Sequence, residues 1–259
     1  METARYALKD CRLCHGQGRV RTGEGITEWA VCPCAVAGLR QEAAARLLQA
    51  TFPPRALAMT LDSFRTGGLA QNERAERAAR SFVDNFIQAR AEGWVLGFYG
   101  EPRAGKTHLG IGIAQACAKR YLCRPVLLNL PKALRQERER FSDNSLPSPF
   151  QAAAQADLLV LDDLGAEYER TADDPSRVSW LSEQLYMLID ERVMNNRPFV
   201  YTTNLTRSDM ERRYSNEAWQ RVYARLREAE VNPGGALEVV RVPEIHKQRN
   251  TDAADLLFS

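Results

Sequence analysis

Four short apolar runs are spaced along the chain between residues 94 and 203. They cover residues 94–99, 126–130, 158–161 and 199–203. Runs of this length without an alternating polar face are typical of buried parallel strands, and the stretches between them are long enough for helical crossovers. The pattern predicts a doubly wound α/β domain, whose ligands bind beyond the carboxyl ends of the strands.

The stretches around these runs have helical spacing. Apolar residues at i, i+3 and i+4 positions predict a helix over residues 75–87, ahead of the first strand. We expect a long helix over residues 177–196 and another over residues 216–228. The residues that should face the core from the first of these helices are Ala75, Ala78, Ala79, Phe82, Val83, Phe86 and Ile87.

A boundary precedes this α/β domain. Residues 38–50 are rich in alanine, leucine and arginine and predict a helix, which ends before Pro53 and Pro54. We therefore divide the 259 residues into an N-terminal module over 1–50, which includes this linker helix, and a larger α/β domain over 51–259.

Composition narrows the classes of partner. The chain is 44% hydrophobic and 26% charged, which suits a protein with a packed core, and its net charge of +2 gives no chain-wide basic field. Binding to DNA would therefore depend on local patches. Because no apolar run approaches about 18 residues and the first residues do not resemble a signal peptide, we expect a cytoplasmic protein without membrane contact.

Four of the six cysteines cluster at the start of the chain. They are Cys11, Cys14, Cys32 and Cys34. A short hairpin over residues 19–21 and 27–31 would return the chain from the first pair to the second. Four thiolates would then hold one tetrahedral Zn²⁺, a structural site that stabilises a segment too short to fold alone. Disulfides and free thiols are the alternatives, and His15 is an alternative ligand because the Cys-Pro-Cys spacing is unusually tight.

Residues 100–107 read GEPRAGKT and fit the spacing G-x-x-x-x-G-K-[ST] of a P-loop. A predicted strand leads in and a proline-free stretch leads out, so the phosphates would meet backbone N–H groups at a helix N-terminus. Lys106 places a cation on the terminal phosphates, and the Thr107 hydroxyl can ligate Mg²⁺. A chance match to the string is the alternative.

Polar residues end two of the predicted strands. Asp162 and Asp163 follow the run 158–161, where the first can hold Mg²⁺ through water and the second can polarise the attacking water. Paired acids at a strand end can instead cap the next turn. Asn204 follows the run 199–203 and either contacts the water or the γ-phosphate, or only starts a turn.

Two arginines share one face of the predicted helix over 216–228. Arg221 and Arg225 are four residues apart. One of them could enter the active site of a neighbouring subunit and stabilise the transition state. The alternative is a solvated charged face, since Arg212, Arg213 and Arg227 lie nearby in the sequence.

With these residues in view, the chain resembles the AAA+ ATPases of the DnaC/DnaI helicase-loader group and the related IstB transposition ATPases over nearly its whole length. Besides the P-loop, the matching segments are Pro53-Pro54-Arg55, Leu61-Asp62-Ser63-Phe64, Leu161-Asp162-Asp163-Leu164-Gly165, Thr202-Thr203-Asn204-Leu205 and Arg221-Val222-Tyr223-Ala224-Arg225-Leu226. The resemblance implies a AAA+ P-loop fold with a small zinc-binding N-terminal domain. That domain resembles one found in some loaders, whereas IstB-type proteins generally lack it.

The resemblance also implies roles for particular residues. Arg225 stands at the arginine-finger position, which implies self-association, and the family places Phe64 next to the adenine. The catalytic residues would be Lys106, Asp162, Asp163, Asn204 and Arg225. The residues expected to contact ATP or ADP are Gly100, Pro102, Ala104, Gly105, Lys106, Thr107, His108 and Phe64, with Thr107 and Asp162 holding Mg²⁺.

The chain departs from the family pattern in two places. Many AAA+ proteins have glutamate where this chain has Asp163, so slow turnover that depends on assembly is expected, although aspartate is usual among the loaders. A second-sensor arginine is expected after the last strand, where Lys247 and Arg249 are the candidates. Too little chain follows Arg225 for a full helical lid domain.

The implied partners are a replicative hexameric DNA helicase and single-stranded DNA. In this group the region after the run 126–130 faces single-stranded DNA. Its basic residues are Lys132, Arg135, Arg138 and Arg140, interrupted by Glu137 and Glu139, so that a solvated helix is the alternative. The leading hypothesis is a helicase loader, and the alternatives are a transposition helper and a nucleotide-gated adaptor with little hydrolysis.

Overall fold

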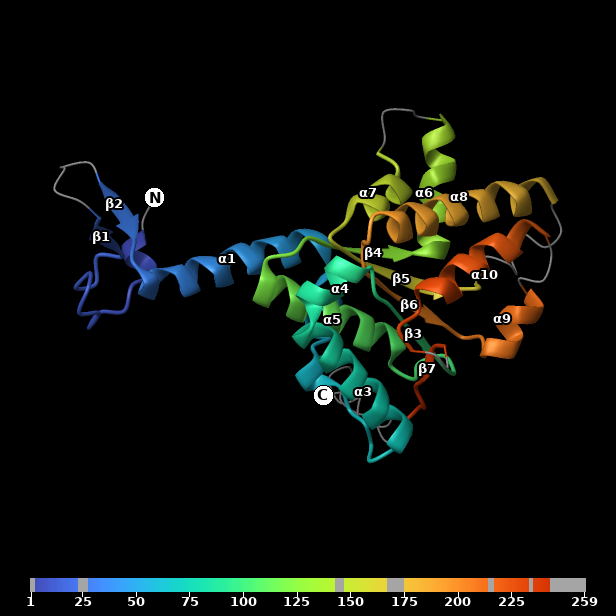
Figure 1. Ribbon diagram of the computed structural model, residues 1–259, viewed down its shortest axis with the longest axis horizontal. Helices are drawn as coiled ribbons and strands as arrows, with labels where there is room; N and C mark the ends of the chain where they lie inside the picture. Colours follow the sequence, from blue (N-terminus) through green and yellow to red (C-terminus); the bar gives the residue numbers. More distant parts are fainter. Residues whose placement is uncertain are drawn as a thin grey trace, which may run out of the picture.

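The computed structural model describes residues 3–22, 28–142, 147–166, 175–213, 217–232 and 235–242. Its centre is a parallel sheet of five strands in the order β4-β5-β6-β3-β7 (Figure 1). The strands are β3 (Val95–Tyr99), β4 (Pro125–Asn129), β5 (Leu158–Leu164), β6 (Phe199–Thr203) and β7 (Leu237–Glu238). The doubly wound α/β class is confirmed.

The strand bounds differ slightly from those predicted. Leu130, predicted to end a strand, begins helix α6 instead. Strand β5 continues past the predicted end at residue 161 to Leu164, so both adjacent carboxylates lie within the strand.

Helices cover both faces of the sheet, and the side chains of each strand alternate between two cores. Leu96, Phe98 and Val160 belong to the core under α3 (Ala70–Asp84), α4 (Phe86–Glu92) and α5 (Lys106–Tyr121). Val95, Leu161 and Tyr201 belong to the other core. That core lies under α6 (Leu130–Ser142), α7 (Pro149–Gln155), α8 (Pro175–Met194), α9 (Arg207–Arg213) and α10 (Glu217–Ala229).

The predicted helix over 75–87 is two helices, α3 and α4, which meet at Asn85. The Asn85 backbone N–H makes the last helical bond of α3, to the Ser81 carbonyl at 3.0 Å, and the Asn85 side-chain amide donates to the same carbonyl at 2.8 Å. In α4 the buried residues are Phe86 and Ala89, whereas Ile87 is 66% exposed because it lies beyond the edge of this buried face. The prediction that Ile87 faces the core is therefore wrong.

The N-terminal module is built on one long helix. The one-turn helix η1 (Thr3–Tyr6) and the antiparallel hairpin of β1 (Arg19–Arg21) and β2 (Trp29–Val31) lie at one end of α1 (Pro33–Thr51), which projects from the α/β domain (Figure 1). The predicted hairpin is thereby confirmed. At the other end of α1, the side chains of Leu48 and Phe52 join the core that α3 and α5 cover.

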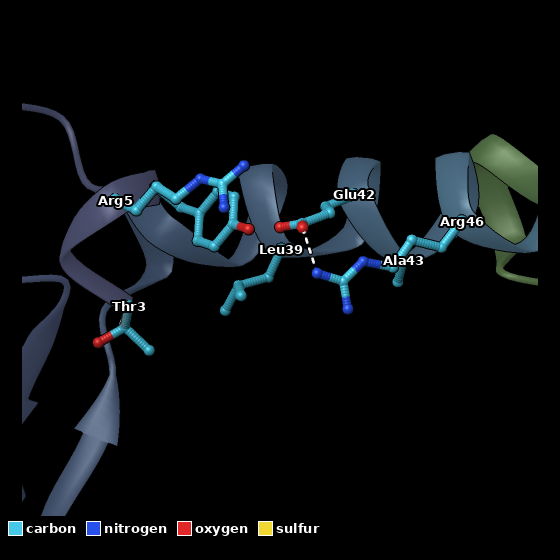
Figure 2. A pocket seen from close by; sticks show the side chains of 7 residues that line it. Thr3, Arg5, Leu39, Glu42, Ala43 and Arg46 are labelled. Carbon is cyan, nitrogen blue, oxygen red and sulfur yellow. Dashed lines mark hydrogen bonds and ion pairs between the residues drawn. The ribbon is translucent and has the colours of Figure 1, made fainter. Parts of the chain in front are cut away.

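Helix α1 begins at Pro33, earlier than the predicted start at residue 38. The proline stands in its first turn, and Gly38 lies inside the helix, where a Cβ atom would come within 2.9 Å of the Tyr6 Cβ. Glycine here permits η1 to pack on α1, beside a shallow pocket with Arg5 on one side and the ion pair of Glu42 and Arg46 on the other (Figure 2). The division at residues 50 and 51 stays a prediction.

The remaining short helices, α2 (Pro54–Leu57) and η2 (Leu61–Ser63), connect α1 to α3. Within the described ranges, no helix combines the length and the apolar character that crossing a membrane requires.

Candidate nucleotide site

The P-loop connects the end of β3 to the first turn of α5. Gly100 and Gly105 have φ angles of 144° and 106°, in the region where glycine is favoured. A side chain at Gly100 would collide with the Val239 carbonyl oxygen of the segment after β7, and one at Gly105 would come within 3.0 Å of the Phe64 ring. The two glycines therefore allow the loop to pass between its neighbours and to present backbone N–H groups at the start of α5.

Lys106 lies over this loop and is only 5% exposed. Its Nζ donates to the carbonyl oxygens of Gly100 and Glu101, at 2.9 and 2.8 Å. Burial lowers the pKa of Lys106, and the nearby charges of Asp163 and Asp162 oppose this. The ammonium group is thus already inside the loop, where phosphate oxygens can replace the two carbonyl acceptors.

Asp162 is the centre of the hydrogen-bond network at the carboxyl ends of the strands. It is 6% exposed, and its Oδ1 accepts from the Thr107 hydroxyl at 2.7 Å and from the Thr202 hydroxyl at 2.8 Å. A carboxylate beside a hydroxyl at the first turn of the P-loop helix is a hard oxygen donor set, which fits Mg²⁺. The structure brings together the two residues that we predicted to hold the ion.

Asp163 follows directly, at a bulge in β5. Its φ angle is 62°, and the register of β5 against β6 shifts between Leu161 and Leu164. Consecutive side chains of a regular strand point to opposite faces, but the bulge turns Asp163 toward the same amide that Asp162 contacts. Burial and, to a lesser extent, the charge of Asp162 raise the pKa of Asp163.

That amide belongs to Asn129, which the sequence analysis did not select. The Nδ2 of Asn129 lies 3.1 Å from Oδ2 of Asp162 and 3.2 Å from Oδ2 of Asp163, so it bridges the two carboxylates. Asn129 ends β4 in register with Asp162. Asp162 and Asn204 each follow an apolar run directly, and Asn129 would satisfy the same rule if its run ended at residue 128, two residues earlier than predicted.

Thr202 is the second residue that the sequence analysis missed. It is fully buried on β6, donates to Asp162, and accepts from the Asp163 backbone N–H at 3.0 Å. Asn204, which we predicted to sense the γ-phosphate, is exposed just after the same strand. Its role stays a prediction.

The segment before α3 covers one side of the loop. Phe64 is 8% exposed and packs edge-on against the His108 ring, with centroids 5.5 Å apart. The Nε2 of His108 lies 2.8 Å from the Thr60 carbonyl oxygen and 3.1 Å from the Ser63 hydroxyl. His108 therefore holds this segment against the P-loop helix, and nucleotide contacts by Phe64 and His108 stay predictions.

The other predicted loop contacts differ in exposure. Ala104 is buried, whereas Pro102 is exposed at the outer edge of the loop. Both stay predicted contacts of the nucleotide. The second-sensor candidates Lys247 and Arg249 lie outside the described residues.

The predicted finger is on α10, which packs against α8 on the face of the sheet opposite α5. The Nε of Arg225 lies 2.7 Å from Oδ1 of Asp190, and another nitrogen of its guanidinium lies 2.9 Å from the Glu228 carboxylate. Arg221 lies over the Tyr186 ring, 4.0 Å from its centroid. The structure thus places Arg225 away from the P-loop of its own chain, and its function in trans stays a prediction.

The basic residues of α6 differ in their pairing. Lys132 and Arg135 are exposed. Arg140 is paired with Glu137 at 2.7 Å, and the same carboxylate accepts from Ser148 at 3.0 Å. The side chain of Arg138 lies outside the described part of the structure. DNA contact by this helix stays a prediction.

The four N-terminal cysteines form a cluster whose sulfur atoms all lie within 4.8 Å of one another. The sulfur atoms of Cys32 and Cys34 are 3.4 Å apart, those of Cys14 and Cys34 are 3.5 Å apart, and those of Cys11 and Cys32 are 3.7 Å apart. Four ligands at the Zn–S distance of about 2.3 Å in a tetrahedron would be about 3.8 Å apart, so the cluster fits zinc.

The four thiols are free, and they differ in pKa. Backbone N–H groups of Leu13 and Cys14 lower the pKa of the Cys11 thiol to about 6, whereas burial raises the pKa of the Cys32 thiol. A backbone hydrogen bond to Leu8 lowers the pKa of the Cys34 thiol, but burial and the neighbouring sulfur atoms outweigh it and raise that pKa to about 12. His15, the alternative ligand, is exposed and does not belong to the cluster. Cys117 and Cys123 are buried in the ATPase core, as expected.

Comparisons with known proteins agree with this geometry. No family model matches the chain. The Bacillus subtilis (strain 168) phage-like element PBSX protein XkdC is 26% identical over 214 residues, which cover 79% of this chain and 74% of that protein.

Among solved structures, the DnaC helicase loader is 25% identical with a TM-score of 0.58, covering 72% of this chain and 99% of that chain. DnaI is 22% identical with a TM-score of 0.58, covering 74% and 93%. The resemblance to the DnaC/DnaI-like AAA+ loaders is confirmed at the level of the fold.

Proposed function

We propose that this chain is an ATP-dependent loader that places a replicative hexameric helicase on single-stranded DNA. One observation carries the proposal. A complete P-loop, with Lys106 inside it and Thr107 bonded to Asp162, lies in a chain that covers 99% of the solved chain of the DnaC helicase loader. The relation to XkdC of a phage-like element fits a host or phage replication role equally well.

The geometry supports ATP hydrolysis by the residues of the chain itself. Lys106 would bind the terminal phosphates, and Thr107 and Asp162 would hold Mg²⁺, which neutralises phosphate charge when bound. A water oxygen attacks the γ-phosphorus, the bond to the β-phosphate oxygen breaks, and ADP and phosphate leave. Asp163 would accept the proton of this water.

Asn129 restrains the Asp163 carboxylate, the proposed proton acceptor. Its amide ties Oδ2 of Asp163 to the Asp162 carboxylate and so restricts how the Asp163 carboxylate can turn toward the attacking water. Together with the raised pKa of Asp163, this restraint supports slow turnover in the isolated subunit. We expect turnover to rise when Arg225 of a neighbouring subunit completes the site.

The remote zinc module is the candidate contact for the helicase. Four large apolar side chains are exposed there, on the loops and on the hairpin strand β2. They are Leu8, Leu13, Trp29 and Val31. The module lies at the end of α1 that is remote from the sheet (Figure 1). Exposed apolar side chains gathered on a small module are typical of a surface that binds another protein.

The direct test is co-purification with the replicative helicase of the host, with ATP, with ADP and without nucleotide. We expect a complex whose affinity depends on the nucleotide, and loss of that dependence in Lys106→Ala. Failure to bind the helicase under every condition would contradict the proposal. Binding to a transposase encoded nearby would favour the transposition helper instead.

A nucleotide-gated adaptor is distinguished by phosphate release. The loader should hydrolyse ATP faster than its Asp163→Asn variant. Equal rates near background for the two proteins would support the adaptor.

A further inference from the structure

A buried chain of polar side chains joins the sheet to α10, and the proposed reaction does not use it. The hydroxyl of Tyr201 donates to the carboxylate of Glu230, which also pairs with Arg227. Tyr201 is 2% exposed, and the side chains of Glu230 and Arg227 are 2% and 23% exposed. Burial raises the pKa of Glu230, while bonds from Tyr201 and Arg227 oppose this.

The sheet is shaped to admit this link. Tyr201 lies on β6 opposite Gly97 of β3, and any side chain at Gly97 would overlap the tyrosine ring. Glu230 follows α10 and pairs with Val95 of β3, where the Val231 backbone N–H bonds to the Val95 carbonyl at 3.0 Å. The end of α10 is therefore fixed to both central strands at once.

The same link sets the place of α10 relative to the catalytic network. The residue after Tyr201 is Thr202, which bonds to Asp162 and to the Asp163 backbone. Among the described side chains of α10, Val222 and Leu226 are fully buried in apolar contacts, and apolar contacts leave the rotation and sliding of a helix less defined than directional bonds do. Arg221 and Arg225 add contacts to Tyr186 and Asp190 of α8, but both arginines lie at the surface rather than in the core. A buried carboxylate is also costly compared with an apolar side chain of similar size.

We propose that Tyr201, Glu230 and Arg227 are positioning residues that fix α10, so that its Arg225 enters the nucleotide site of the neighbouring subunit. This inference rests on the proposed assembly through Arg225. The link acts in the subunit that donates the finger, not in the subunit that holds the ATP. That asymmetry separates positioning of the finger from a general effect on folding.

Mixed assemblies test this asymmetry. A Lys106→Ala subunit cannot bind ATP but can donate its finger, and an Arg225→Ala subunit binds ATP but donates none. In a mixture of the two, stimulated hydrolysis comes only from ATP on the second subunit completed by the first. Tyr201→Phe, which keeps the buried ring but removes the hydroxyl, is added to either subunit in turn.

We expect Tyr201→Phe in the donor to lower the stimulated rate by roughly ten- to a hundredfold, the effect of a small misplacement of a catalytic group. The same substitution in the acceptor should change the rate by less than about twofold, because that subunit donates no finger. Equal losses in both positions, or no loss in the donor, would overturn the inference.

Two controls keep the outcome clear. Tyr121→Phe removes a hydroxyl that bonds to the Val83 and Asp84 carbonyls at 2.9 and 3.2 Å, away from α10, and should be silent in both subunits. If Tyr201→Phe does not fold, Arg227→Gln tests the other end of the link in the same assay. If the mixture without Tyr201→Phe shows no stimulated hydrolysis, the trans site itself is wrong, and the positioning role falls with it.

Discussion

Asn129 is the residue on which the chemistry of the site depends most closely. It holds two adjacent carboxylates with one amide, at 3.1 and 3.2 Å, and so opposes the rise in the pKa of Asp163 that burial and Asp162 produce. Asp163 can accept a proton from water only as a carboxylate. With Asp163 in its proposed role, hydrolysis should fall as the pH falls through the raised pKa of Asp163.

Removal of the Asn129 amide should shift the acid limb of the pH profile of ATP hydrolysis. In Asn129→Ala, Asp163 loses a bond that lowers its pKa, so the acid limb of the pH profile of ATP hydrolysis should shift to higher pH than in the unaltered protein. Steady-state phosphate release measured across the acid range checks this. Asn85→Ala, at the junction of α3 and α4, is the matched control and should leave the limb in place. An unmoved limb in Asn129→Ala would mean that Asp163 is not the group that titrates.

At the scale of elements, the sequence predicts the strands well because buried parallel strands are continuous apolar runs, and each of the four predicted runs is a strand of the sheet. Features set by local backbone geometry escape it. The bulge that turns Asp163 beside Asp162 depends on one φ angle, and the break at Asn85 depends on bonds to Ser81 that leave the apolar period unchanged. The start of α1 at Pro33 is not predicted, because Pro33 lies between two cysteines and this pattern indicates a metal cluster and not the beginning of a helix.

Helix α10 holds Arg225, the proposed arginine finger. Arg225→Ala should leave ATP affinity nearly unchanged, because Arg225 contacts Asp190 and Glu228 rather than the P-loop of its own chain. The rate in assemblies should fall about a thousandfold or more, if the finger contributes as arginines do elsewhere in phosphoryl transfer. Titration with a fluorescent ATP analogue and assays at rising protein concentration measure the two effects.

The control is Arg221→Ala, which removes a neighbouring arginine that stacks on Tyr186. A loss confined to Arg221→Ala would assign the finger to that residue instead. Normal stimulated hydrolysis in both variants would show that neither arginine completes a neighbouring site.

At the scale of the whole molecule, α1 separates two functions. The cysteine cluster lies at its first turn, whereas its last turn is part of the ATPase core through Leu48 and Phe52 (Figure 1). The metal would stabilise a module that has little core of its own. In the described part of the chain, α1 joins this module to the nucleotide site. A substitution that removes metal and helicase binding should therefore leave ATP binding intact, and the reverse should also hold.

Cys11→Ser with Cys32→Ser should therefore release zinc and abolish helicase binding, while ATP affinity remains. Metal analysis, helicase co-purification and ATP titration on one preparation check the three outcomes together. His15→Ala should retain the metal, because His15 is exposed outside the cluster. Loss of ATP affinity in the double variant would contradict the separation of the two parts.

Helicase loading by this protein can be measured directly as the amount of replicative helicase bound to circular single-stranded DNA. The assay compares no added protein, the unaltered chain with ATP, and Lys106→Ala with ATP. We expect the unaltered chain to raise the amount of DNA-bound helicase and Lys106→Ala to leave it unchanged. Equal amounts of bound helicase in all three reactions would contradict the proposed loading.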